Sequence, residues 1–146
     1  MGDTGTQPST DELLERLLES ASPESYLQSL PSFDRSFNGL LTKVASAKGR
    51  SRAEVIRRSG VTTSYGYQVF SGARQPSRDV AVMLALGAGA TLKETQDLLT
   101  RAGLGRLWAK DPRDAVVMFG IERGWDRVKI DDRLFNAGLP TLLKAE

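Results

Sequence analysis

Apolar residues recur three and four positions apart along most of the chain, whereas the strict apolar–polar alternation typical of strands is nearly absent. The clearest stretch is 33–47, whose apolar positions are Phe33, Phe37, Leu40, Leu41 and Val44. Small polar residues precede most such stretches and glycines follow many of them, as at the ends of helices. This pattern predicts an all-α fold with tight turns.

Residues that start and stop helices divide the pattern into short segments. Ser9 with Glu12 and Ser51 with Glu54 match the capping box, in which both side chains satisfy backbone N–H groups. Further helix starts are expected at Ser22, Phe33, Thr62, Ser77, Thr91 and Asp126, and helix ends at Gly49, Gly60 and Gly72.

The last part of the chain contains an internal repeat. Residues 78–107 align with 113–142 without a gap, at a shift of 35 positions, and eleven of the thirty aligned residues are identical. Each copy has the pattern of a helix, a glycine turn and a second helix that ends in glycine. We therefore expect two similar helical hairpins, derived from a duplication, that pack together.

Charge is distributed unevenly along the chain. Residues 1–34 carry seven acids and one arginine, a net charge of −6, and residues 35–78 carry nine lysines and arginines and one acid, a net charge of +8. Residues 79–146 are balanced, with ten charges of each sign. The cationic block in the middle of the chain predicts a polyanionic partner.

Residues 51–71, within this cationic block, have the pattern of a helix-turn-helix, two short helices joined by a glycine turn. The second helix, at about 62–71, begins with small polar residues, which suits entry into the major groove of DNA. The residues expected on its outward face are Thr63, Ser64, Tyr67 and Gln68. Their side chains offer hydrogen bonds or apolar contacts to base edges.

Gly66 lies in the middle of this second helix, where glycine costs about 1 kcal/mol relative to alanine. In helix-turn-helix units a small residue of the first helix usually meets a branched residue of the second. Here the sizes are exchanged, and we expect Gly66 to leave room for Ile56 of the first helix.

The stretch 51–77, "SRAEVIRRSGVTTSYGYQVFSGARQPS", resembles the Cro/lambda-repressor-like (XRE) helix-turn-helix domains of bacterial transcriptional regulators, with no insertion. The resemblance rests on the cap at Ser51–Glu54, the turn at Gly60–Val61, Gln68 and the run "SGARQPS". It covers about residues 33–107. It implies a lambda-repressor-like domain in a transcriptional regulator that binds double-stranded DNA sequence-specifically.

The same resemblance implies roles for individual residues. It assigns base reading to Thr63, Ser64 and Gln68, which Tyr67 joins on the same face, and contacts with the DNA backbone to Arg52, Arg74 and Gln75. The other expected phosphate-contacting residues are Lys43, Lys48, Arg50, Thr62 and Arg78. The sequence departs from the family at Ala73, where a lysine is usual, and at Tyr67, where serine or alanine is common.

The expected organisation has three parts. An acidic N-terminal helical arm occupies 1–32, the helix-turn-helix DNA-binding domain occupies 33–107, and the second helical hairpin at 108–146 packs on the first. Domains of this kind bind as homodimers to inverted half-sites about 34 Å apart. Both the leucine face of the arm and the duplicated hairpins are candidates for the dimer contact.

A protein-interaction module, such as an antitoxin-like protein or an adaptor, is the alternative function on the same fold. In this hypothesis the acidic arm covers the basic segment, or the face with Tyr65 and Tyr67 binds a protein partner. Only a DNA reader needs the side chain of Gln68 in a groove, so the effect of Gln68→Ala on DNA affinity separates the two hypotheses.

The residues that most enzymes and metal sites use are missing. The chain has no histidine, no cysteine, no phosphate-binding Gly-x-x-x-x-Gly-Lys run and no carboxylate cluster with metal-ligand spacing. We therefore expect that the protein is not an enzyme and that it has no catalytic residue, metal or cofactor. The N-terminal stretch is unlike a signal peptide, and no apolar run approaches the roughly 20 residues that cross a bilayer. These features predict a cytoplasmic protein without a membrane partner, which associates with the nucleoid when it binds DNA.

Four residues of the repeat region are assigned from their position in the pattern. Trp108 and Trp125 lie near the hairpin junctions, and we expect both rings to pack in the core or between the hairpins. Asp131 and Asp132 are adjacent on a predicted helix, and we expect both to face solvent.

Overall fold

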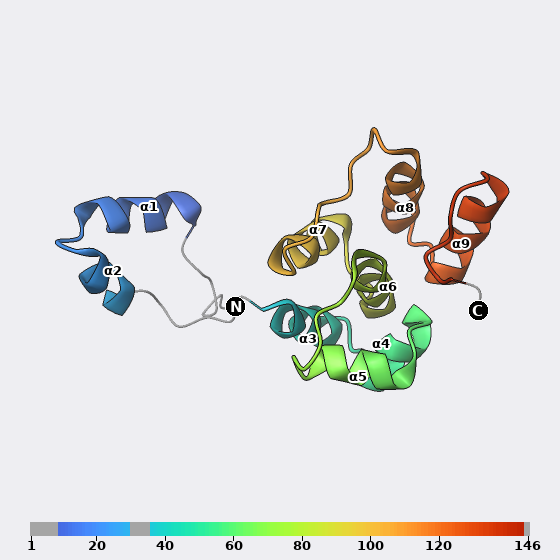
Figure 1. The fold of residues 1–146 in the computed structure, drawn as a ribbon, viewed down its shortest axis with the longest axis horizontal. Coiled ribbons are helices and arrows are strands. Elements are labelled where there is room, and N and C mark those ends of the chain that lie inside the picture. Colours follow the sequence, from blue (N-terminus) through green and yellow to red (C-terminus); the bar gives the residue numbers. More distant parts are fainter. Residues whose placement is uncertain (1–8, 30–35, 145–146) are drawn as a thin grey trace. The chain divides into compact units, whose positions relative to one another are not determined.

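The computed structural model describes residues 9–29 and 36–144, and within these ranges the chain is all-α, with nine helices and no strand. It divides into two compact units, residues 1–34 and 35–146. The helices labelled in Figure 1 are α1 (Thr10–Glu19), α2 (Pro23–Ser29), α3 (Phe37–Ala47), α4 (Arg52–Ser59), α5 (Thr63–Phe70), α6 (Arg78–Ala88), α7 (Leu92–Arg101), α8 (Pro112–Glu122) and α9 (Arg127–Asn136). The predicted all-α class is confirmed for the described residues.

The first unit contains α1 and α2, and α1 exposes its apolar side. Ser9 caps α1 by accepting a hydrogen bond from the N–H of Glu12 at 3.1 Å. No residue of α1 is buried, and the side chains of Leu14, Leu17 and Leu18 are all exposed. The leucine face predicted for the arm is therefore present and stays uncovered within this unit.

In the second unit, α6 is the central helix. Seven of its eleven residues are buried, and it packs against α3, α4, α7 and α9. Figure 1 shows α6 surrounded by α3, α4 and α7. The approach of α4 is so close that a Cβ atom on Gly87 would collide with the backbone oxygen of Val55. A small residue at position 87 is therefore a requirement of the packing between α4 and α6.

Side-chain caps set the helix starts in this unit. The caps of α3 to α9 are Ser36, Ser51, Thr62, Ser77, Thr91, Asp111 and Asp126. Each accepts a hydrogen bond from a backbone N–H three residues further on. Helix α3 therefore begins at Phe37, and its predicted start at Phe33 lies outside the described residues. The predicted capping box at Ser51 and Glu54 forms only in part. Ser51 caps α4, whereas the carboxylate of Glu54 accepts a hydrogen bond from Nε of Arg58 at 2.9 Å.

Two reciprocal ion pairs join the hairpins of the repeat, α6–α7 and α8–α9. Arg78 in α6 bonds both carboxylate oxygens of Asp114 in α8, at 3.0 and 2.8 Å. Arg113 in α8 bonds both oxygens of Asp79 in α6, at 2.8 and 3.0 Å. Residues that correspond in the sequence repeat thus hold the hairpins together reciprocally, as expected for two copies related by an approximate twofold axis.

A second pair of equivalent contacts closes each hairpin. In the first, Oε1 of Gln96 accepts the N–H of Leu107 at 2.7 Å. In the second, Oδ1 of Asp131 accepts the N–H of Leu142 at 2.6 Å. Asp131 is therefore buried, and the prediction that it faces solvent is wrong, whereas Asp132 is exposed as expected. The buried carboxylate is tolerated because backbone N–H groups satisfy it.

The two tryptophans have different environments. Trp108 is 62% exposed, so the prediction that it packs in the core or between the hairpins is wrong. Its backbone N–H, and not its ring, is the part held by the fold, through a hydrogen bond to Asp114. Trp125 is half-buried against the core, and its ring packs on that of Phe119 in a T-shaped arrangement with 5.4 Å between the ring centroids, which confirms its packing role.

Candidate nucleic-acid interface

Helices α4 and α5 cross at Gly66 and Ile56. A Cβ atom built on Gly66 would lie 2.6 Å from Cγ1 of Ile56, well inside van der Waals contact. The predicted exchange of sizes at this crossing is confirmed, and the absence of a side chain at Gly66 lets the two helices approach. In the α8–α9 hairpin the sizes are the usual ones, with Gly120 on the first helix and Ile130 on the second, again at 2.6 Å.

The turn before α5 holds the start of that helix in place. Gly60 ends α4 with a φ of 82°, which favours glycine. The buried hydroxyl of Ser59 accepts the N–H of Val61 at 3.1 Å. Thr62 then caps α5 by accepting the N–H of Tyr65. Together these contacts present the N-terminal turn of α5 in a defined direction.

Helix α5 has one buried and one exposed side. Gly66, Val69 and Phe70 are buried. Thr63, Ser64, Tyr67 and Gln68, the four predicted base-reading residues, are all exposed. Short hydroxyl side chains lie in the first turn, and the phenol and the amide follow one turn later. This surface can donate and accept hydrogen bonds without first breaking a buried contact.

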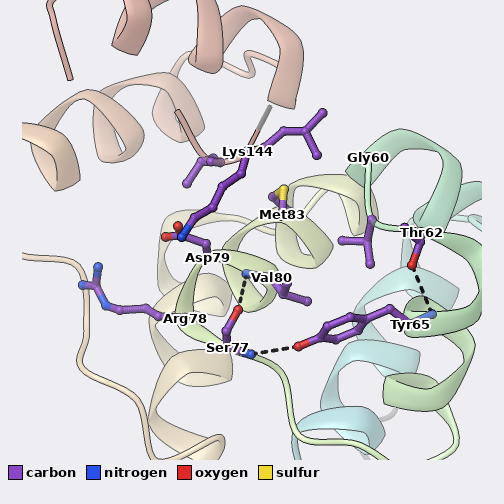
Figure 2. Close-up of a pocket in the computed structure, with 12 residues that line it drawn as sticks. Gly60, Thr62, Tyr65, Ser77, Arg78, Asp79, Val80, Met83 and Lys144 are labelled. Atoms are coloured by element: carbon purple, nitrogen blue, oxygen red, sulfur yellow. Dashed lines mark hydrogen bonds between the residues drawn. The ribbon is translucent and has the colours of Figure 1, made fainter. Parts of the chain in front are cut away.

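Tyr65 packs inside the fold and joins the end of the α5–α6 loop to α5. Its hydroxyl accepts the N–H of Ser77 at 3.3 Å, and Figure 2 shows the ring reaching from α5 toward that residue. On its ring lies the guanidinium of Arg74, 3.9 Å from the ring centroid. Arg74 is thereby positioned next to the exposed face of α5 while remaining exposed.

Four more of the predicted phosphate-contacting residues have exposed side chains. Arg52, at the start of α4, is exposed, and its guanidinium lies 5.6 Å from the centroid of the Phe70 ring. Lys43, Thr62 and Gln75 are exposed as well. Arg52 and Arg74 thus both stack on aromatic rings of α5, which places two cations close to the predicted reading helix.

Three of the predicted phosphate-contacting cations are engaged within the protein. Nη1 of Arg50 donates to the backbone oxygen of Gly87 at 2.8 Å, and Nζ of Lys48 lies 3.6 Å from Glu94. Arg78 is committed most fully, since Nε, Nη1 and Nη2 all donate to protein acceptors. A phosphate contact by Arg78 would require breaking this network, so we remove it from the candidate interface.

The ion pair between Arg78 and Asp114 shifts the pKa of both groups. The hydrogen bond to Asp114 raises the pKa of Arg78, against the opposing effect of burial. Burial by itself would raise the pKa of Asp114, but hydrogen bonds from Arg78 and from the N–H of Trp108 outweigh it and hold that pKa below its ordinary value. Both groups are therefore charged at neutral pH.

A hollow of about 510 Å³ lies beside the start of α5. Its walls come from the turn before α5, from α6 and from the C-terminal segment at 142–144. Figure 2 shows Thr62 and Tyr65 on one side of it and Lys144 on another. Val80 and Met83 give the α6 wall an apolar character.

The described residues contain no group of three or more acidic residues positioned to hold a metal ion. Within the same ranges, no helix is both long enough and apolar enough to span a membrane. Comparison of the chain with protein-family models, with curated proteins and with solved structures finds no match.

Proposed function

We propose that the protein is a sequence-specific transcriptional regulator that binds double-stranded DNA through a lambda-repressor-like helix-turn-helix formed by α4 and α5. The observation that carries this proposal is the polarity of α5. One side is buried against α4 and the core, and the other exposes Thr63, Ser64, Tyr67 and Gln68 beside two cations. A short helix of this kind fits the major groove.

Base reading in this proposal depends mainly on Gln68. Its amide can form two hydrogen bonds with adenine, one as donor and one as acceptor. Thr63 and Ser64 read neighbouring base edges from the first turn, and Tyr67 contacts a base or a thymine methyl group. Each well-formed bidentate contact contributes about 1–3 kcal/mol of discrimination between bases.

Phosphate contacts hold α5 in register. Arg52 and Arg74 flank the helix, and Lys43 and Gln75 are exposed on neighbouring segments. The N-terminus of α5, capped by Thr62, adds the positive end of a helix dipole. A homodimer would place two such helices about 34 Å apart, and the exposed leucine face of α1 is one surface suited to the dimer contact.

The test is fluorescence anisotropy with a labelled duplex from the region upstream of the protein's own gene and with a scrambled duplex of the same composition. We expect the wild-type protein to prefer the upstream duplex and to lose affinity steeply as salt rises, because counterions are released. Gln68→Ala should abolish the preference. Asn136→Ala, which truncates an exposed amide on α9, is the matched control and should keep it.

Equal, weak binding to both duplexes that is indifferent to Gln68→Ala would contradict the proposal for this operator. Selection of binding sites from a random duplex library then extends the test to all sequences. Failure to enrich any site would reject sequence-specific DNA binding altogether.

The second candidate function is a protein-interaction module, and exposed apolar side chains favour it. Phe119, Val128 and Phe135 of the second hairpin are 47%, 53% and 75% exposed. Such residues on a folded surface are typical of protein contacts. A protein partner is compatible with DNA binding. If both DNA tests failed, protein interaction would be the remaining candidate function.

A further inference from the structure

We propose that an open cavity bordered by α4, the α6–α7 turn and the α8–α9 turn binds a small molecule that carries two or more phosphate groups. Its volume is about 470 Å³, within the range of small-molecule sites. Four arginines line it: Arg50, Arg57, Arg58 and Arg127. None of the predicted base-reading residues lines it, so the proposal goes beyond DNA recognition and does not depend on it.

The arginines offer more donors than the fold uses. A guanidinium carries five N–H donors, and Arg50 and Arg58 each donate from a single nitrogen, to Gly87 and Glu54 respectively. Arg57 is 72% exposed on its side chain, and its closest carboxylate oxygen, on Glu54, lies 4.0 Å away. The remaining N–H groups can bind phosphate oxygens in the bidentate manner that arginine favours.

Arg127 lines the cavity with a largely buried guanidinium. Its Nη1 bonds Asp131 at 2.7 Å, while its Nε is buried and lacks a hydrogen-bond partner among the described residues. Gly60 packs directly against this nitrogen, because a Cβ atom there would lie 2.7 Å from Nε of Arg127. The part of the Arg127 side chain that remains exposed, 13%, is what this residue contributes to the lining of the cavity.

The charges and the backbone around the cavity also favour an anion. One carboxylate lines it, that of Asp126, and its Oδ1 already accepts the N–H of Lys129 at 2.8 Å. The positive N-terminal ends of α7 and α9 adjoin the cavity at Thr91 and Asp126. Four cations from three segments, with Arg57 and Arg58 adjacent on α4, therefore line a concave space, which suits a compact polyphosphate better than the convex backbone of a duplex.

The test uses inorganic pyrophosphate as the probe and Trp125 as the reporter. Trp125 lines the cavity and becomes the single tryptophan of the chain once the exposed Trp108 is replaced in Trp108→Phe. We expect a saturable change in Trp125 fluorescence and a matching heat in isothermal titration calorimetry. In Arg57→Gln/Arg58→Gln, the dissociation constant should rise by about tenfold or more, because charge-assisted hydrogen bonds are lost.

Two control variants distinguish binding of pyrophosphate in the cavity from its nonspecific attraction to positive charge elsewhere on the surface. Lys93→Gln removes an exposed cation on α7, and Arg74→Gln removes one beside α5; both should change the pyrophosphate affinity by less than about twofold. Circular dichroism verifies that each variant is folded.

Three outcomes would overturn the proposal. One is the absence of saturation by both methods at about 10 mM pyrophosphate, which corresponds to negligible affinity. Another is an equal loss in the control variants. The third is a loss of duplex affinity in Arg57→Gln/Arg58→Gln as large as the loss of pyrophosphate affinity, which would assign the arginines to DNA. Because the titrations contain no DNA, failure of the DNA-binding proposal leaves their result unaffected.

Discussion

Arg78 and Asp114 form a bidentate ion pair, at 3.0 and 2.8 Å, that joins the first helices of the two hairpins. Arg113 and Asp79 form the equivalent pair in the opposite direction. The Arg–Asp dipeptide that opens both copies of the repeat therefore serves two contacts, since its arginine reaches the other copy and its aspartate receives that copy's arginine. This reciprocity gives the duplicated sequence a structural purpose.

Replacing Arg78 by alanine should destabilise the protein substantially. The change leaves the buried carboxylate of Asp114 without its guanidinium and removes the hydrogen bonds to the oxygens of Gly105 and Arg106. We expect the free energy of unfolding to fall by about 2–4 kcal/mol, measured by urea denaturation. Arg106→Ala, at an exposed side chain, is the control, and a similar loss in both variants would contradict a special role for the ion pair.

The lowered pKa of Asp114 predicts a loss of stability in acid. Because this pKa is lower in the folded than in the unfolded chain, the unfolded chain binds more protons between the two values. The contribution of Asp114 is complete above the unfolded pKa of about 3.9 and is lost as the pH falls through the folded value. We expect the stability difference between wild type and Asp114→Asn to shrink in urea denaturation as the pH is lowered from about 5 to values below the unfolded pKa. A constant difference would show that the charge of Asp114 is not responsible.

Gly66→Val should overpack the crossing of α4 and α5. Even its Cβ atom would lie 2.6 Å from Ile56, and both positions are buried. We expect a loss of about 1–3 kcal/mol in the free energy of unfolding. Ile56→Ala in the same chain should recover part of the loss, because it restores the size order found between Gly120 and Ile130. Strictly additive effects of the two changes would contradict direct contact.

Gly87→Ala tests the closest approach in the core. The new Cβ atom would collide with the backbone oxygen of Val55, and a backbone cannot move aside as a side-chain end can. We expect a loss of at least about 2 kcal/mol in thermal or urea unfolding. Gly105→Ala is the matched control, because its Cβ atom would have open space apart from Nε of Arg78 at 4.0 Å. Equal stability of the two variants would reject this account of the α4–α6 packing.

Local patterns in the sequence were sufficient to predict the helices and the exposed face of α5. Caps such as Thr62 and Ser77 act on N–H groups three residues away, so their effect is visible in a short stretch of sequence. The size exchange at Gly66 and Ile56 was also predictable, because the two residues belong to adjacent helices joined by a short turn. The hydroxyl and amide groups on the outside of α5 follow from the helical period alone.

Contacts between distant segments were decided by the tertiary structure. The sequence does not distinguish a cation of the basic block that faces solvent from one that pairs with a distant acid, as Arg78 does with an aspartate 36 positions away. Asp131 is buried because the backbone after α9 returns to bond its carboxylate, whereas Trp108 is exposed although its backbone N–H bonds Asp114. The arginine-lined cavity likewise unites Arg50 with Arg127. Burial and pairing of this kind depend on long-range packing, which a local pattern of residue types does not encode.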